Sequence, residues 1–187
     1  MRHPVLPRMG RAVITAVAVL GLIVLATRLT AQQPPEIKPG PEHAQFKEWE
    51  GTWDATIKGM GPESKGTATC KVGLNGLWLL EHFKGDFGGM PFEGYGATSY
   101  DPAKKKYINT WIDSMVTSPM ITEGTYDKAK KTLTMVGEMP MPGGKTAKVT
   151  MTTVTKDTDT RIFTMNGPGP DGKVGEMFTI IYKRRAK

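Results

Sequence analysis

The sequence has 187 residues, of which 23% are charged and 39% are hydrophobic, and its formal net charge at pH 7 is +7. Residues 1–31 hold four of the 25 basic residues and no acidic one, so the other 156 residues carry 21 basic and 18 acidic side chains, a net charge of +3. They contain no basic run with interleaved aromatic residues, which argues against nucleic acid as a partner. The single cysteine, Cys70, excludes a disulfide within the chain, and we expect it to be a small buried hydrophobic residue.

Residues 1–31 predict an export signal. Between Arg11 and Arg28 runs AVITAVAVLGLIVLAT, 16 residues that are apolar apart from two threonines. As a helix this run would be about 24 Å long, which is shorter than the roughly 30 Å hydrocarbon core of a bilayer. The pattern favours a signal peptide cleaved after Ala31, with an uncleaved membrane anchor as the alternative. The expected location is therefore extracytoplasmic, periplasmic or secreted, in a bacterium, and the membrane is a partner only if the segment is uncleaved.

A proline-rich linker and a short helix are expected next. Prolines recur in QQPPEIKPGPE, so residues 32–40 predict an extended linker. A single domain then covers residues 41–187. Near the start of this domain, His43, Phe46 and Trp49 recur at a spacing of three residues. This spacing predicts a short helix with these side chains on one face. We therefore expect His43 to pack against the domain and not to bind a metal.

Beyond Gly51 the pattern changes to short alternating segments rich in Thr, Val, Ile and aromatic residues, separated by turns with Gly, Pro, Asp and Lys. This pattern is typical of an all-β protein. Short connections make consecutive strands antiparallel neighbours, and closure of the sheet removes both edges. The predicted fold is an antiparallel up-and-down β-barrel of about ten strands with a short N-terminal helix as a plug. The expected strands are 52–59, 65–74, 77–87, 92–100, 107–114, 119–126, 132–139, 146–155, 160–166 and 175–184.

The strand register predicts which residues face the interior. YDPAKKKY and YDKAKKTL, which start at residues 100 and 126, predict the same hairpin connection and place Tyr100 opposite Tyr107. We further expect Phe87 opposite Phe92. One face then carries large side chains opposite glycines, as a crowded concave face requires. From this face we predict the ligand-binding residues Glu81, Phe83, Thr98, Asn109, Trp111, Met120 and Met135.

Within this set, Glu81, Thr98 and Asn109 are expected to form one row across three strands. Without a cationic partner, a buried Glu81 would be protonated and could donate to a ligand oxygen. The alternative is a carboxylate that Thr98 and Asn109 satisfy and that only holds the sheet register. Few polar groups among aromatic and methionine side chains are typical of small-molecule sites.

Evidence for an enzyme is weak, and whether the protein is one stays open. No serine elbow is visible, and the three histidines lie in the leader, the short helix and the outer face. Glu81 and Asp113 would be about 16 Å apart, whereas carboxyl groups that cooperate in glycoside hydrolysis lie roughly 5 to 9.5 Å apart. No cofactor or metal is expected. Met139 and Met141 are compatible with a copper(I) motif, but such a pair is more often a turn with apolar neighbours.

Two resemblances add to this interpretation. The short helix followed by Gly51-Thr52-Trp53 is similar to the calycin arrangement of lipocalins and fatty-acid-binding proteins. More narrowly, EHAQFKEWEGTWD, GGMPFEGYGATSYDPAKKKY and TWIDSM resemble the secreted bacterial family called domain of unknown function 1579, over about residues 40–187. This family has no established activity to carry over. The calycin resemblance implies a structural plug, in which Arg184 lies over the ring of Trp53 and contributes roughly 0.5 to 2 kcal/mol.

Three functional classes follow. The favoured one is a barrel that binds a small apolar or amphipathic ligand, because eight strands are often filled by side chains whereas ten leave room for a cavity. The second is a packed structural or interaction module of the cell envelope with no small-molecule ligand. The third is an enzyme. The sequence does not indicate an oligomeric state.

Overall fold

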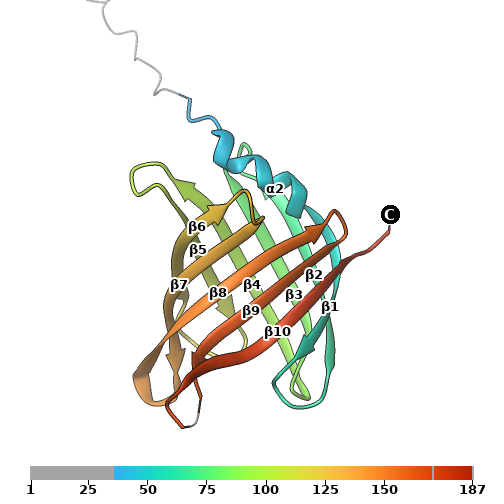
Figure 1. The fold of residues 1–187 in the computed structure, drawn as a ribbon, viewed down its shortest axis with the longest axis vertical. Coiled ribbons are helices and arrows are strands. Elements are labelled where there is room, and N and C mark those ends of the chain that lie inside the picture. Colours follow the sequence, from blue (N-terminus) through green and yellow to red (C-terminus); the bar gives the residue numbers. More distant parts are fainter. Residues whose placement is uncertain (1–35, 170, 187) are drawn as a thin grey trace, which may run out of the picture. The chain divides into compact units, whose positions relative to one another are not determined.

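Ten antiparallel strands form a closed barrel in the computed structural model, which describes residues 36–169 and 171–186 (Figure 1). Each strand pairs with its neighbours along the chain, and β10 pairs with β1 to close the sheet. The predicted up-and-down barrel is therefore confirmed. The predicted signal peptide, 1–31, and the first part of the predicted linker lie outside the described residues.

The elements agree closely with the sequence-based expectation. A short 3-10 helix, η1 (Pro41–His43), leads into α2 (Ala44–Trp49), and a second one, η2 (Pro142–Gly144), connects β7 to β8. None of the helices in the described part of the chain is long and apolar enough to span a membrane. The strands are β1 (Gly51–Lys58), β2 (Ser64–Gly73), β3 (Trp78–Phe87), β4 (Met90–Asp101), β5 (Lys106–Asp113), β6 (Met120–Asp127), β7 (Thr132–Met141), β8 (Lys145–Asp157), β9 (Thr160–Pro168) and β10 (Val174–Arg184).

Two hairpins share the connection that the repeated sequence predicts. At the end of β4, Asp101 Oδ1 accepts hydrogen bonds from the backbone amides of Ala103 and Lys104, and at the end of β6, Asp127 Oδ1 accepts one from Lys130. Aspartate readily stabilises turns in this way. Tyr100 lies opposite Tyr107, as predicted, and Tyr126 lies in the corresponding position opposite Leu133.

The predicted register of the β3–β4 hairpin is wrong by two residues. Phe87 lies opposite Met90, not opposite Phe92, because the turn contains only Gly88 and Gly89. Both glycines have positive φ angles, 63° and 90°, which a two-residue hairpin turn needs and which glycine adopts without strain.

A shift of two residues keeps every side chain on its predicted face. It moves Glu81 out of the expected row with Thr98 and Asn109 and places it opposite Gly96, which in turn lies opposite Trp111.

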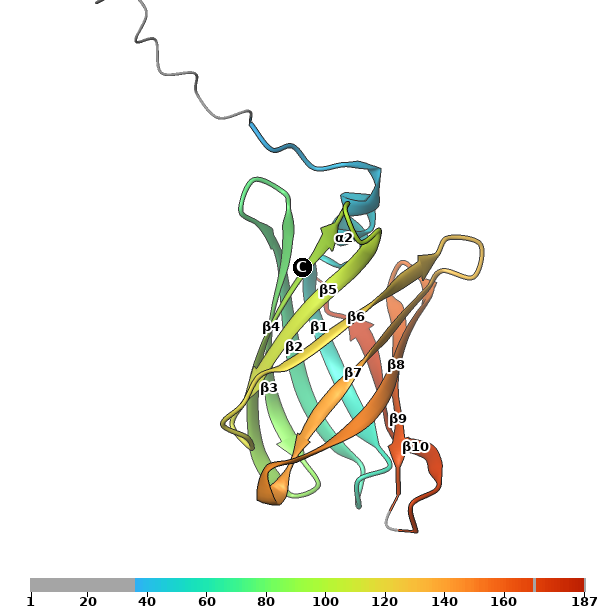
Figure 2. The same ribbon diagram turned by 90° about the vertical axis from the view of Figure 1, so that its left-hand side faces the viewer.

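The helix α2 lies across the end of the barrel at which β1 begins and β10 ends (Figures 1 and 2). Phe46 and Trp49 on its inner face are almost completely buried, and the ring of Phe46 packs edge-on against Tyr107. The hydroxyl of Tyr107 donates to the carbonyl of Glu42 at 2.7 Å. His43 packs edge-on against Phe46, and its Nδ1 accepts the amide of Gly40. The helix therefore closes this end of the barrel.

Candidate functional site

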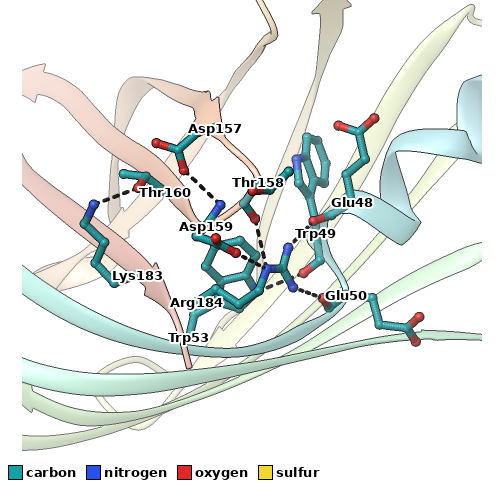
Figure 3. Close-up of polar contacts among 10 residues, drawn as sticks. All are labelled: Glu48, Trp49, Glu50, Trp53, Asp157, Thr158, Asp159, Thr160, Lys183 and Arg184. Atoms are coloured by element: carbon teal, nitrogen blue, oxygen red, sulfur yellow. Dashed lines mark hydrogen bonds and ion pairs between the residues drawn. The ribbon is translucent and has the colours of Figure 1, made fainter. Parts of the chain in front are cut away.

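Trp53 is the centre of the closed end. It is 1% exposed, and its indole Nε1 donates to the carbonyl of Trp49 at 3.0 Å. The guanidinium of Arg184 lies over its ring, 4.1 Å from the centroid (Figure 3). Arg184 also donates to the carbonyls of Glu48 and Glu50 at 2.6 Å each. The carbonyl of Glu48 lies in the last turn of α2, where no intrahelical donor is available, and that of Glu50 belongs to the residue directly after the helix, so Arg184 fastens the helix to the last strand.

A second arginine, Arg161 on β9, lies on the cavity side of the same tryptophan. Its guanidinium carbon is 4.6 Å from the centroid of Trp53 and 4.5 Å from that of Tyr182. The side chain is almost fully buried. Our sequence analysis missed this residue. It could have been identified from the sequence, because alternation along β9 puts Arg161 on the same face as Phe163 and Met165.

The polar contacts of Arg161 leave part of its guanidinium unsatisfied. Nη2 donates to the sulfur of Cys70 at 3.2 Å, and Oε1 of Glu81 is 3.9 Å from the same nitrogen, too far for a hydrogen bond. Nε has no hydrogen-bond partner among the described residues. Glu81 therefore has a cationic partner. The expectation that Glu81 acts as a neutral donor assumed that no cationic partner was present, and Arg161 removes that premise.

Two other groups near Arg161 stay uncharged at neutral pH. Burial, helped by the charge of Glu81, raises the pKa of the Cys70 thiol to about 12. Burial likewise raises the pKa of Tyr182 well above its ordinary value. Cys70 is thus a buried thiol and not a reactive thiolate.

Beyond the closed end, the barrel contains a cavity of about 160 Å³. The structure brings the seven residues predicted from the sequence together in its wall, although the β3–β4 register differs. They are Glu81, Phe83, Thr98, Asn109, Trp111, Met120 and Met135. Asn109 donates to Thr98 Oγ1 at 2.9 Å, and among the described residues neither side chain forms a hydrogen bond with Glu81.

Large rings fit in this wall because they lie against glycines. A Cβ atom at Gly94 would be 2.4 Å from Cζ2 of Trp111, and one at Gly66 would be 2.5 Å from Cζ of Phe83. Any larger residue at these positions would have to displace a ring. Gly94 and Gly66 thus determine how closely the rings of Trp111 and Phe83 can pack against the backbone of the barrel wall.

Aromatic side chains that the sequence analysis did not include line the end opposite α2. The ring of Phe87 is 4.9 Å from that of Phe92 and 5.1 Å from that of Phe178, and Phe163 lies 5.8 Å from Phe178. Phe87 and Phe92 come from β3 and β4, whereas Phe163 and Phe178 come from β9 and β10, and barrel closure brings these two parts of the chain together. Phe92, Phe163, Phe178 and Trp111 are only partly buried. The cavity is therefore polar near Glu81 and Arg161 and aromatic toward the other end.

The described residues contain no cluster of three or more His, Cys, Asp or Glu side chains that could hold a metal ion. Met139 packs against the core, whereas Met141 is exposed at the end of β7. The arrangement in the cavity thus offers a fixed cationic donor, one carboxylate and an apolar wall, which together can bind a molecule with a polar and an apolar part.

Comparison with curated proteins finds no match. Among solved structures, the chain is similar to one described as a redesigned beta barrel, with 17% sequence identity and a TM-score of 0.37, over 75% of this chain and 95% of that one. The sequence profile of the family described as protein of unknown function (DUF1579) matches residues 38–184. The chain belongs to this family.

Proposed function

We propose that the protein binds a small amphipathic molecule inside its barrel. The observation that supports this most is the cavity itself, whose wall combines the charged pair of Glu81 and Arg161 with aromatic and methionine side chains. A barrel that served only as a packed module would gain stability from filling this space with apolar side chains. A buried arginine with an unpaired Nε is costly in such a module, whereas a ligand can satisfy it.

The size of the cavity limits what it can hold. At about 160 Å³ it is close to the roughly 150 Å³ of an engineered cavity that binds benzene. A head group with a ring or a short chain therefore fits inside. Because Phe92, Trp111 and Phe178 are partly exposed, the apolar remainder of a longer molecule can lie among them, at the end away from α2.

A screen by native mass spectrometry tests this proposal. The protein is mixed with a bacterial lipid and metabolite extract, and we expect a bound species that is lost or reduced in Trp111→Ala, because this change removes a ring from the cavity wall. Trp78→Ala is the matched control, since alternation along β3 puts Trp78 on the outer face. If no species is retained, or if both variants retain it equally, the proposed binding site is wrong.

We also propose that the barrel works outside the cytoplasm, on the basis of the charged leader and its short apolar run. Protein recovered from the extracytoplasmic fraction is expected to begin at or near Gln32, which N-terminal sequencing would determine. Membrane-extracted protein that still begins at Met1 would instead identify the segment as an anchor.

An interaction module is the second candidate, and one surface feature favours it. On the outer face of β3 to β6, Leu80, Tyr95, Ile112 and Ile121 are each more than a third exposed. Tyr95 and Ile112 lie directly opposite each other on β4 and β5. Grouped exposed apolar residues are typical of contact surfaces. Retention of a protein partner that is lost in Ile112→Lys, with no bound small molecule, would favour this function.

A further inference from the structure

We infer that the ligand carries an uncharged head group that both donates and accepts hydrogen bonds, and that this head bridges Glu81 and Arg161. This inference rests on the proposed function and names the class of molecule that the cavity takes. Carboxamides are the simplest members of this class, because an amide N–H can donate to Glu81 while its carbonyl accepts from Arg161.

The first argument is the separation of the two charges. Arg161 Nη2 and Glu81 Oε1 are 3.9 Å apart, so the pair attracts without a direct hydrogen bond. Both residues line the same cavity, and Nε of Arg161 has no partner among the described residues. Buried charged groups normally satisfy their hydrogen-bonding capacity. A small polar group between or beside the two side chains would do so here.

The second argument is that the arginine is held in place. Trp53 and Tyr182 lie 4.6 and 4.5 Å from its guanidinium carbon, and Cys70 accepts a hydrogen bond from Nη2. Moving the guanidinium toward Glu81 would disturb these packed contacts. The guanidinium is therefore a preorganised donor.

The third argument is the balance of charge. Among the described residues that line the cavity, Glu81 is the only acidic residue and Arg161 the only basic one. The raised pKa values of Cys70 and Tyr182 keep both groups neutral. Arg184 lies over Trp53 and is engaged with backbone carbonyls of Glu48 and Glu50. The cavity wall is therefore neutral overall, and a third charge would be unpaired in a poorly solvated space.

Charged head groups fit this arrangement less well. A carboxylate can accept from Arg161 but offers no donor to Glu81 and repels it. An ammonium group can donate to Glu81 but has no acceptor for Arg161. Of these three kinds of head group, the uncharged donor and acceptor is the one that uses both residues without adding charge.

Three probes of equal chain length test the inference by calorimetry at pH 7.5, with protein expressed from the complete coding sequence. We expect octanamide to bind with a dissociation constant at least about tenfold lower than those of octanoate and octylammonium, a ratio that a single unpaired charge readily produces. Wild-type protein alone gives this comparison, so it does not depend on any variant folding.

Glu81→Gln provides a second readout. It leaves Arg161 as the only charge in the cavity wall, so we expect octanoate to bind at least about tenfold more tightly than to wild type and to match or exceed octanamide. Glu138→Gln, which removes an exposed carboxylate on β7, is the matched control and should leave all three affinities unchanged.

Each outcome decides one of the two proposals. If wild type binds octanoate or octylammonium as tightly as octanamide, the neutral head group is wrong and small-molecule binding still stands. If none of the three binds, the inference is also wrong, and the extract screen then decides the proposed function separately. If Glu81→Gln and Glu138→Gln change octanoate binding equally, the effect is not one of the cavity and the bridging role of Glu81 is refuted.

Discussion

Trp53→Ala is expected to lower the free energy of unfolding by about 3 to 5 kcal/mol. Trp53 is almost completely buried, and it packs between the guanidinium groups of Arg184 and Arg161. Its indole nitrogen also donates to the carbonyl of Trp49, so the change removes both a large ring and a bond to the helix. Urea unfolding followed by circular dichroism measures the loss.

Two variants place this value in context. Arg184→Ala should cost about 1 to 2 kcal/mol, because it removes a cation–π contact and the donors to Glu48 and Glu50 but little packed volume. Trp78→Ala removes the same ring from the outer face and should cost clearly less than Trp53→Ala. If the Trp53 and Trp78 variants are equally stable, Trp53 does not hold the closed end together.

Arg161→Met is the second change for which we expect a large effect, a loss of about 3 kcal/mol. The variant keeps an apolar chain of similar length between Trp53 and Tyr182 but leaves the carboxylate of Glu81 in the cavity without its cation. The side chain of Glu81 is only 24% exposed, so water replaces the lost partner poorly. Thermal and urea unfolding measure this loss.

The double variant Arg161→Met with Glu81→Gln tests the cause. Removing the stranded charge should recover about 1 to 2 kcal/mol, because the two residues interact and their effects are not additive. Arg185→Met is the matched control: Arg185 forms an exposed ion pair with Asp54, and its loss should not measurably change stability. A double variant no more stable than Arg161→Met would show that lost packing, not the unpaired carboxylate, causes the effect.

The architecture could be predicted from local patterns. Each of the ten strands carries its own alternation and ends at a turn residue, and the helix shows its period in His43, Phe46 and Trp49. Asp101 and Asp127 determine two turns through bonds to amides within three residues. Each of these patterns lies within a few neighbouring residues, so it can be recognised without knowing which distant segments are in contact.

Two features could not be predicted from local patterns: the register of the β3–β4 hairpin and the cationic partner of Glu81. The β3–β4 register followed from the conformation of Gly88 and Gly89, and a four-residue loop was equally compatible with the sequence. The partner of Glu81 was missed because barrel closure brings Arg161 to it, and the contact of Arg161 with Cys70 joins residues 91 positions apart. The seven predicted wall residues still lie in the wall, because a shift of two residues preserves the face.

Methyl NMR of methionine most directly tests whether a ligand enters the barrel. Met120, Met135, Met151 and Met165 line the cavity, whereas Met60, Met90 and Met115 are exposed. With ¹³C-methyl methionine in the protein, addition of the unlabelled bacterial extract should shift the signals of the first group and leave those of the second unchanged. Shifts confined to the exposed methionines, or no shift at all, would contradict binding inside the barrel.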